Sequence, residues 1–266
     1  MSDNLISPLA YVHPTAKIGQ NVKIHPFAYI DKDVVIGDET IVMAHATILE
    51  GAVLGKNNYV YQNAVIGATP QSFRYKKGHL THVVIGNNNR IRENVVIAGS
   101  LDESTATTIG DNNFLMDGVH ICHDVKIGND CVLGIHAQIA GDCVLEDHVV
   151  LSSAAILQHR VRVGRFSLLQ SGCRVQKDVP PYIILGGNPA AYRGVNSLIL
   201  EKEGETERIL RHIANTYRLV YTGGFSLQDA VIKIKEQIPS SVEIENIINF
   251  IKDSKHGIVR HRKDEE

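Results

Sequence analysis

An aliphatic residue returns at every sixth position along most of this 266-residue chain, and this period constrains the fold more than any other feature. It matches neither the period of about 3.6 of an amphipathic helix nor the period of about 2 of a half-buried strand. Two long runs, separated by a short one, carry the pattern. They are Val12, Ile18, Ile24, Ile30, Ile36, Val42, Ile48, Leu54, Val60 and Ile66; Ile85, Ile91 and Ile97; and Ile109, Leu115, Ile121, Ile127, Leu133, Ile139, Leu145, Leu151, Leu157, Val163, Leu169 and Val175.

A six-residue unit fits one flat face of a triangular prism. A short strand carries the aliphatic residue inward, and a turn rich in glycine, asparagine and aspartate makes the corner. Three units complete a coil of eighteen residues, and strands of successive coils pair in parallel about 4.8 Å apart. The repeats therefore predict an all-β, left-handed parallel β-helix of roughly eight to nine coils, about 40 Å tall.

Two interruptions divide the repeat array. In residues 67–84 the pattern resumes one residue out of phase, and in residues 98–108 one expected hexad is replaced. We expect both segments to be loops extruded from the prism, where binding residues tend to lie. Beyond the array the apolar spacing becomes helical. We therefore expect a β-helix domain over residues 1–190 and an α-helical C-terminal domain over residues 191–266.

Composition excludes several classes of function. Lysine and arginine total 27 against 29 aspartate and glutamate, a formal charge of −2, which argues against a nucleic-acid binder. No apolar run approaches the roughly 20 residues of a membrane span, and the N-terminus lacks a signal-peptide pattern. The four cysteines show neither C-x-x-C spacing nor the density of a disulfide scaffold. We expect a cytoplasmic protein with no nucleic-acid partner and no membrane span.

The eighteen-residue coil converts sequence spacing into geometry. His123, Gly141 and His159 are eighteen residues apart, so they should form one vertical column with about 4.8 Å between neighbours. Acyl transfer to a hydroxyl needs a base for the proton and a donor for the developing oxyanion. His123 and the Gly141 amide are candidates for these roles, and Asp124 could steady the tautomer of the imidazole.

Other interpretations of these residues stay open. The chain has 13 histidines, most of which will be surface or turn residues, and His123 can be one of them. Clustered histidines also bind zinc, but His120 and His123 are only three residues apart. Cys122 is a candidate nucleophile that lacks an evident activating partner. A basic side of the helical end could receive an acidic carrier protein or could be a solvated face. It comprises Arg208, Arg211, Arg218, Lys252, Lys255, Arg260 and Arg262.

Across nearly its whole length the chain resembles the UDP-N-acetylglucosamine 3-O-acyltransferases, the family that starts lipid A synthesis. Total length, the two interruptions and the helical tail also resemble this family. The motifs that carry the resemblance are Tyr61-Gln62-Asn63-Ala64-Val65-Ile66-Gly67, Asn89-Arg90-Ile91-Arg92-Glu93-Asn94-Val95, Gly118-Val119-His120-Ile121-Cys122-His123-Asp124, Lys177-Asp178-Val179-Pro180-Pro181-Tyr182 and Gly194-Val195-Asn196.

The resemblance implies transfer of a 3-hydroxyacyl group from acyl carrier protein to the 3-hydroxyl of the UDP-sugar, with no metal and no cofactor beyond the carrier's thioester. It implies a homotrimer with active sites between subunits. In that family the general base, its supporting carboxylate and the oxyanion amide match His123, Asp124 and Gly141. Substrate-contacting positions match Gln71, Ser72, Arg74, His120, Gln158, His159, Asn196 and Lys202, and the position that gates acyl length matches Ser171.

The departures from the family pattern gather around the nucleotide sugar. Ala98-Gly99-Ser100-Leu101 stands where His or Asn followed by Arg-Gly-Thr is usual, and Asp142 stands where a histidine is common. The usual His-Gln pair is transposed as Gln158-His159. Two alternatives follow: an acyltransferase acting on a different UDP-amino sugar by O- or N-acylation, or a weakly active or inactive paralogue that binds acyl carrier protein. The remaining departures are Ser72 for an aspartate, Arg74 for a lysine, and Leu198, Lys202 and Glu203 for a glutamate and two arginines.

Overall fold

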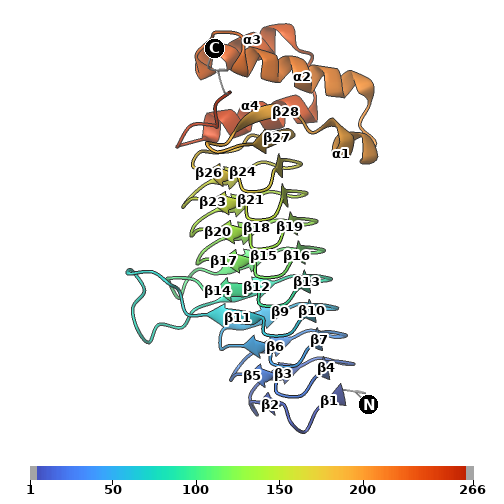
Figure 1. The fold of residues 1–266 in the computed structure, drawn as a ribbon, viewed down its shortest axis with the longest axis vertical. Helices are drawn as coiled ribbons and strands as arrows, with labels where there is room; N and C mark the ends of the chain where they lie inside the picture. Colours follow the sequence, from blue (N-terminus) through green and yellow to red (C-terminus); the bar gives the residue numbers. More distant parts are fainter. Residues whose placement is uncertain (1–4, 262–266) are drawn as a thin grey trace.

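The computed structural model describes residues 5–261, which form a tall parallel β-solenoid with a helical cap at its C-terminal end (Figure 1). Every third strand pairs in parallel with the next, so three sheets make the three faces. Sheet A comprises β1 (Leu5–Ile6), β4 (Lys23–Ile24), β7 (Ile41–Val42), β10 (Tyr59–Val60), β13 (Arg90–Ile91), β16 (Phe114–Leu115), β19 (Val132–Leu133), β22 (Val150–Leu151), β25 (Leu168–Leu169), β27 (Ile183–Gly186) and β28 (Ala191–Val195).

The other two faces are slightly shorter. Sheet B comprises β2 (Tyr11–Val12), β5 (Tyr29–Ile30), β8 (Thr47–Ile48), β11 (Val65–Ala68), β14 (Val96–Ala98), β17 (His120–Ile121), β20 (Gln138–Ile139), β23 (Ile156–Leu157) and β26 (Arg174–Val175). Sheet C comprises β3 (Lys17–Ile18), β6 (Val35–Ile36), β9 (Ala52–Leu54), β12 (Val83–Ile85), β15 (Thr107–Ile109), β18 (Lys126–Ile127), β21 (Val144–Leu145) and β24 (Arg162–Val163).

The hexad residues build the core as the sequence predicts. From Ile24 to Val175 every one of them is buried, whereas Val12 and Ile18 in the lowest coils are half-buried. Corner residues take the left-handed backbone conformation, as at Asn57 with φ of 54°, which asparagine and aspartate tolerate better than other side chains. The predicted β-helix is confirmed.

The solenoid is taller than the hexad count suggested. Ten strands of sheet A, from β1 to β27, pair in parallel, against the roughly eight to nine coils expected. The first of these strands contains Ile6, which continues the hexad series below Val12, and the last contains Leu185, which lies beyond the proline-rich segment. Ile6 was missed although it is in phase with Val12, whereas Leu185 follows Val175 by ten residues and lies outside the hexad series.

A buried ladder of amides runs up one inner edge of the core. The Asn89 backbone N–H and Nδ2 donate to Asn58 Oδ1 at 2.9 and 3.1 Å. Asn89 Nδ2 also donates to the Gly110 carbonyl at 2.9 Å, and Asn89 Oδ1 accepts from the Asn113 N–H at 2.8 Å. The Asn113 Oδ1 then accepts from the Cys131 N–H at 2.8 Å. Each side chain forms hydrogen bonds with backbone groups of the flanking coils, because polar groups buried in a core need hydrogen-bond partners.

Both interruptions leave the solenoid at the same corner, between sheets B and C. Paired residues are normally eighteen apart, but Leu54 pairs with Ile85 and Ile85 pairs with Ile109. These spacings are 31 and 24 residues, so thirteen and six extra residues are extruded. The expectation that the second interruption replaces a hexad is therefore wrong: no face is missing, because six residues are added at the corner. The first loop projects sideways from the level of β11 (Figure 1).

The cap begins with the antiparallel pair β27 and β28 and continues with four helices. Thr206, Ser226 and Ser241 are N-caps, each accepting a hydrogen bond from a backbone N–H three residues later. None of the helices in the described chain is both long and apolar enough to cross a bilayer. The helices are α1 (Ser197–Lys202), α2 (Glu207–Tyr221), α3 (Leu227–Gln237) and α4 (Val242–Asp253).

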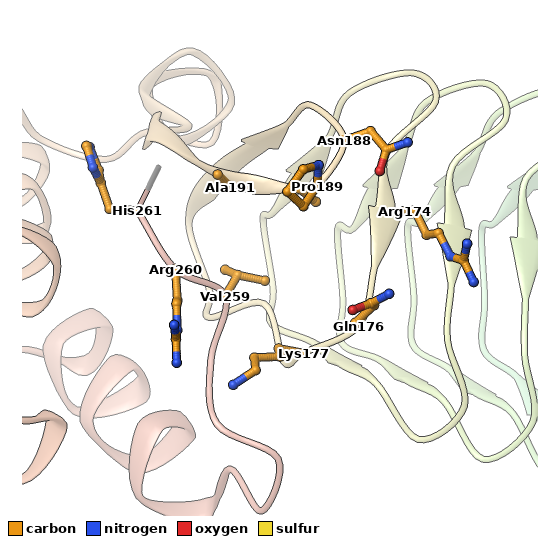
Figure 2. Close-up of a pocket in the computed structure, with 10 residues that line it drawn as sticks. Arg174, Gln176, Lys177, Asn188, Pro189, Ala191, Val259, Arg260 and His261 are labelled. Atoms are coloured by element: carbon orange, nitrogen blue, oxygen red, sulfur yellow. The ribbon is translucent and has the colours of Figure 1, made fainter. Parts of the chain in front are cut away.

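The segment after α4 returns to the top of the solenoid. Residues 259–261 run beside the turn between β27 and β28 and above the end of β26, as Figure 2 shows. The Val259 N–H donates to the Asp178 carbonyl at 2.9 Å, and the Tyr192 N–H donates to the Arg260 carbonyl at 3.1 Å. The Tyr217 hydroxyl of α2 donates to the Pro181 carbonyl. These contacts fix the cap on the last coil.

The amide ladder yields a stability prediction. Asn89→Ala leaves the Gly110 carbonyl and the Asn113 N–H without partners in the core, and we expect a loss of about 2–4 kcal/mol in the free energy of unfolding. Denaturant titration followed by circular dichroism measures it. Asn215→Ala, on the exposed side of α2, is the matched control. Equal stability of the two variants would contradict a structural role for the ladder.

Candidate active site

The candidate site lies at the corner between sheets B and C, where both loops emerge. His123, Gly141 and His159 each stand two residues after a buried core residue of sheet B, on three successive coils. The centroids of the two imidazole rings are 6.1 Å apart. The predicted column is confirmed, because the parallel register places equivalent residues above one another.

The second loop holds the acidic partner of His123. The Nδ1 of His123 lies 3.0 Å from Asp124 Oδ2, and the His123 side chain is 9 % exposed. The other carboxylate oxygen, Oδ1, accepts from the Thr105 hydroxyl at 2.7 Å, and Oδ2 also accepts from the Leu101 N–H at 3.1 Å. The Asp124 N–H donates to the Thr107 hydroxyl at 2.9 Å. Since an ionised carboxylate only accepts, this arrangement favours a proton on Nδ1 and leaves Nε2 free to accept.

Gly141 lets the imidazole lie against the backbone of the next coil. A Cβ at this position would lie 2.4 Å from Cε1 and 2.6 Å from Nε2 of His123, so close approach is what requires glycine here. The Gly141 carbonyl accepts from the Arg160 N–H at 3.0 Å. Its own N–H has no hydrogen-bond acceptor among residues 5–261. A backbone donor is therefore available beside the Nε2 edge of the ring.

Asp142 is the hub of a charged network above the dyad. Its Oδ2 lies 3.1 Å from His159 Nε2, 3.6 Å from the Arg74 guanidinium and 3.6 Å from Arg160 Nε. Arg74 comes from the first loop, so this network joins that loop to the solenoid. Burial lowers the pKa of His159, although the Asp142 carboxylate opposes the shift. The histidine is therefore a neutral hydrogen-bonding partner near pH 7.

A hollow of about 350 Å³ separates the first loop from this corner. Carboxylates and cations face each other across it, a setting that can receive a polar molecule. Its lining residues are Arg74, Lys76, His79, Leu101, Asp102, Thr105, Asp124 and Asp142.

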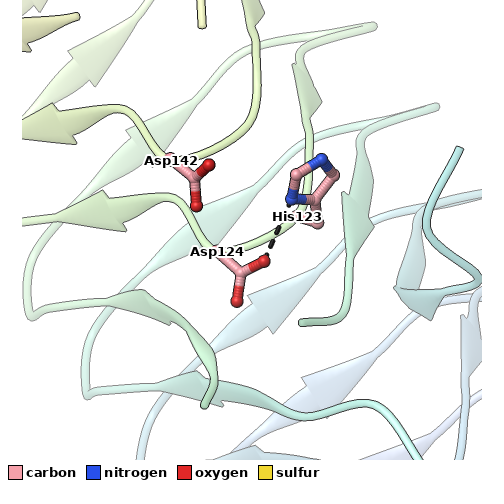
Figure 3. Close-up of side chains that lie close together, drawn as sticks. All are labelled: His123, Asp124 and Asp142. Atoms are coloured by element: carbon pink, nitrogen blue, oxygen red, sulfur yellow. Dashed lines mark hydrogen bonds and ion pairs between the residues drawn. The ribbon is translucent and has the colours of Figure 1, made fainter. Parts of the chain in front are cut away.

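The dyad and Asp142 also form a candidate metal cluster. One ligand atom from each of His123, Asp124 and Asp142 lies within 4.8 Å of the others (Figure 3). Both oxygens of Asp124 already accept hydrogen bonds, and three cationic or imidazole groups surround Asp142. The candidate ligand atoms are therefore already held by hydrogen bonds and ion pairs within the protein. These contacts account for the clustering of the two carboxylates with His123.

His120 stands on the outer surface of sheet B, beside the column and on the same coil as His123. It pairs with Gln138 on the next coil, which pairs with Ile156, which pairs with Arg174. Burial lowers the pKa of His120 and raises the pKa of the Cys122 thiol. A raised thiol pKa is the opposite of what a thiolate nucleophile needs, so Cys122 lacks activation in this environment.

Several predicted substrate residues lie elsewhere in the single chain. Ser171 is exposed at the corner between sheets A and B, and Lys202 ends α1 on the side of the cap opposite the first loop (Figure 1). Asn196 is buried, and its Nδ2 donates to the Phe166 carbonyl at 2.9 Å. One chain does not bring these three residues to His123.

The first loop carries Gln71 and Ser72 as predicted. Gln71 is exposed, and the Ser72 hydroxyl accepts from the Arg74 N–H at 3.2 Å, which shapes the turn that presents the guanidinium. Gln158 immediately precedes His159 and is half-buried. Contact of Gln71, Ser72 and Gln158 with a substrate stays a prediction.

Sequence reasoning missed the residues that hold Asp124 and Asp142. Thr105 and Thr107 were not singled out, although the second loop returns to the solenoid on the coil below Asp124. Arg160, one residue after His159, was also missed. The sequence did contain a signal for these residues. Both loops leave the hexad series directly after a strand of sheet B, at the corner that carries His123, so loop residues should lie near that histidine.

Comparison with known proteins first defines a class. Residues 106–141 match the model described as bacterial transferase hexapeptide (six repeats), and residues 6–101 match the GMPPB C-terminal domain. Residues 178–259 match the model of UDP N-acetylglucosamine O-acyltransferase, domain 2. Solenoid and cap together are thus those of a hexapeptide-repeat acyltransferase.

Full-length relatives then specify the family. An acyl-[acyl-carrier-protein]–UDP-N-acetylglucosamine O-acyltransferase of Halorhodospira halophila is 40 % identical over 96 % of this chain and 99 % of its own length. One from Burkholderia ambifaria is 42 % identical over the same shares. The crystal structure of LpxA from Bacteroides fragilis 9343, a UDP-N-acetylglucosamine acyltransferase, is 45 % identical with a TM-score of 0.94, covering 96 % of this chain and 100 % of that one. The chain belongs to the UDP-N-acetylglucosamine O-acyltransferase family.

The contact between Gly141 and His123 can be tested directly. In Gly141→Ala the new methyl group must displace the imidazole, and we expect a loss of acyltransferase kcat of about tenfold to a hundredfold, because small displacements of a reacting group are costly. A crystal structure of the variant should show the ring rotated away from the next coil.

Gly172→Ala is the control, since a Cβ there meets open space, although its φ of 71° imposes some backbone strain. An unmoved imidazole and unchanged kcat in Gly141→Ala would contradict the close packing described for this corner.

Proposed function

We propose that this protein transfers a 3-hydroxyacyl group from acyl carrier protein to the 3-hydroxyl of UDP-N-acetylglucosamine, the first step of lipid A synthesis. The observation that carries the proposal is the imidazole of His123, held by Asp124 on one side and packed against the unused Gly141 N–H on the other. The names of the relatives support the two substrates. The geometry supports the order of the chemical steps.

In the proposed reaction Nε2 of His123 removes the proton of the acceptor hydroxyl. The resulting oxygen nucleophile attacks the thioester carbonyl, and the Gly141 N–H donates to the oxyanion that forms. Collapse of the tetrahedral intermediate breaks the carbon–sulfur bond. The imidazolium returns the proton to the departing thiolate, so the ester and the free thiol form with no net proton change.

Asp124 acts in this scheme by fixing one tautomer and stabilising the imidazolium. The hydrogen bonds from Thr105 and Leu101 hold its carboxylate in place, and both come from the second loop. The loop therefore serves as structural support for the base. This role does not depend on the polar side chains that the family usually carries at the start of the loop, where this chain has Ala98 and Gly99.

The proposed enzyme is a homotrimer in which a neighbouring subunit completes each site. Ser171, Asn196 and Lys202 match substrate positions of the family but lie away from His123 within one chain. A second copy that presents these residues to the corner between sheets B and C would reconcile both facts. Sedimentation equilibrium of the purified chain measures the mass, and a monomer at micromolar concentration contradicts this arrangement.

A different UDP-amino sugar is the second candidate acceptor. The charged network around Asp142 places a carboxylate beside His159, and the guanidinium of Arg74 reaches it from the first loop. A carboxylate there suits an amino group on the sugar, and N-acylation would then use the same base. An inactive paralogue is the third alternative, against which the intact dyad argues.

One assay distinguishes the three candidate functions. Wild-type protein is incubated with 3-hydroxyacyl carrier protein and a panel of UDP-sugars that includes UDP-N-acetylglucosamine and its 3-amino analogue, and acylated products are identified by mass spectrometry. We expect product from UDP-N-acetylglucosamine and, for His123→Ala, a rate lower by about 10²–10⁴-fold.

His256→Ala, an exposed histidine after α4, is the matched control and should retain full activity. Product from the amino analogue alone would establish the second candidate. No product from any sugar, or full activity of His123→Ala, would overturn the proposed mechanism.

A further inference from the structure

The first loop is joined to the catalytic corner by a single polar contact. The hydrogen bonds of its residues 69–79 link positions two to four apart within the segment, as between the Tyr75 N–H and the Ser72 carbonyl at 3.0 Å. Among residues 5–261, the ion pair between Arg74 and Asp142 is the only hydrogen bond or ion pair that joins residues 69–79 to another part of the chain. The position of this segment on the solenoid therefore depends on one pair of charges.

The two ends of this ion pair are held very differently. Asp142 belongs to the solenoid, on the coil next to that of His123 (Figure 3), and its N–H donates to the His123 carbonyl at 3.1 Å. His159 Nε2 at 3.1 Å and Arg160 Nε at 3.6 Å hold the same carboxylate oxygen that faces the loop. The Arg74 end has no comparable support from the solenoid. The carboxylate is thus a fixed anchor, and the guanidinium is carried by a segment that can move away from it.

The strength of the ion pair suits a reversible contact. Its charged atoms lie 3.6 Å apart, and the side chains of Arg74 and Asp142 are 56 % and 33 % exposed. Exposed ion pairs change an equilibrium by a factor of roughly two to five. Such a factor is small beside the stability of the whole fold. It is large enough to shift a segment without other polar ties between a position on the solenoid and a position away from it.

The position of the loop determines access to the proposed base. Arg74 and Lys76 of the loop line the hollow of about 350 Å³, and Asp124 and Asp142 line it from the solenoid. Asp124 in turn holds His123 at 3.0 Å. While Arg74 contacts Asp142, the loop forms one wall of this hollow, and release of the contact removes that wall. Closure of a loop over a polar site retains the substrate and excludes water.

We infer that Asp142 is a positioning residue: through Arg74 it holds the first loop over the catalytic corner, and this latch opens and closes in each turnover. The UDP-sugar enters while the latch is open and is retained while it is closed. The inference rests on the proposed function for the identity of the retained substrate. Because only the closed form retains the sugar, the apparent KM rises as the closed population falls.

Hydrogen exchange of the free protein, followed by mass spectrometry, tests the latch without any substrate. Asp142→Asn removes the charge and introduces a residue type that tolerates the backbone φ of 58°. We expect the amides of residues 69–79 to exchange about two- to fivefold faster in Asp142→Asn and in Arg74→Gln, with an unchanged unfolding midpoint. Arg74→Lys keeps the charge and should stay close to wild type. Asp130→Asn, at an exposed corner with φ of 55°, is the matched control.

Steady-state kinetics with 3-hydroxyacyl carrier protein and UDP-N-acetylglucosamine connect the latch to turnover. In Asp142→Asn we expect the KM for the UDP-sugar to rise about two- to fivefold, with kcat changed by less than about twofold. The same substitution should have no further effect in an Arg74→Gln background, because both changes remove one contact. Asp130→Asn should have the kinetic constants of wild type.

Four results overturn the inference. They are unchanged exchange of residues 69–79 in Asp142→Asn, faster exchange over the whole solenoid with a lowered unfolding midpoint, a fall in kcat with an unchanged KM for the sugar, and effects of the Asp142 and Arg74 substitutions that multiply. If wild-type protein yields no product from any UDP-sugar, the proposed function fails separately. The exchange of residues 69–79 then still decides whether Asp142 holds the loop.

Discussion

The parallel hydrogen-bonded register between coils is the constraint on which the rest of this structure depends. Because strands pair residue for residue across eighteen positions, a side chain at a corner always lies beneath the equivalent residue of the next coil. Backbone ladders and the buried amides of Asn58, Asn89 and Asn113 hold this register. A base and an oxyanion donor can therefore be built from residues that are eighteen apart without any flexible element between them.

Insertions at one corner convert this rigid array into a site. Both loops leave between sheets B and C, where they add walls without disturbing the strands. The second loop supplies the groups that hold Asp124, and the first loop supplies Arg74 to the network around Asp142. Scaffold and surroundings are thus separated: the coils position the proposed base and the proposed oxyanion donor, and the loops determine what surrounds them.

The fold was largely predictable from the sequence because a six-residue period has few structural solutions. The column of His123, Gly141 and His159 followed from the same arithmetic and is confirmed. Ile6 is in phase with the first run, but it is 42 % exposed at the open end of the solenoid, so the contrast between core and surface positions fades there. Repeat counting is therefore dependable inside a run and weak at its ends.

The side-chain network was less predictable because it joins residues of different loops and coils. Thr105 contacts Asp124 only after six extra residues leave and rejoin the solenoid. Arg74 and Arg160 meet at Asp142 from segments that are 86 positions apart, and no local spacing indicates this. Residues such as Ser171, Asn196 and Lys202 were predicted from family resemblance alone, and one chain does not test their roles.

A crystal structure with a UDP-sugar and a non-hydrolysable thioether analogue of the 3-hydroxyacyl donor bound together tests the central claim most directly. Stacked coils should place the acceptor oxygen within hydrogen-bond distance of His123 Nε2 and the donor's carbonyl oxygen within hydrogen-bond distance of the Gly141 N–H. Ligands bound with their reacting atoms at another corner of the prism, or with the carbonyl turned away from Gly141, would contradict it.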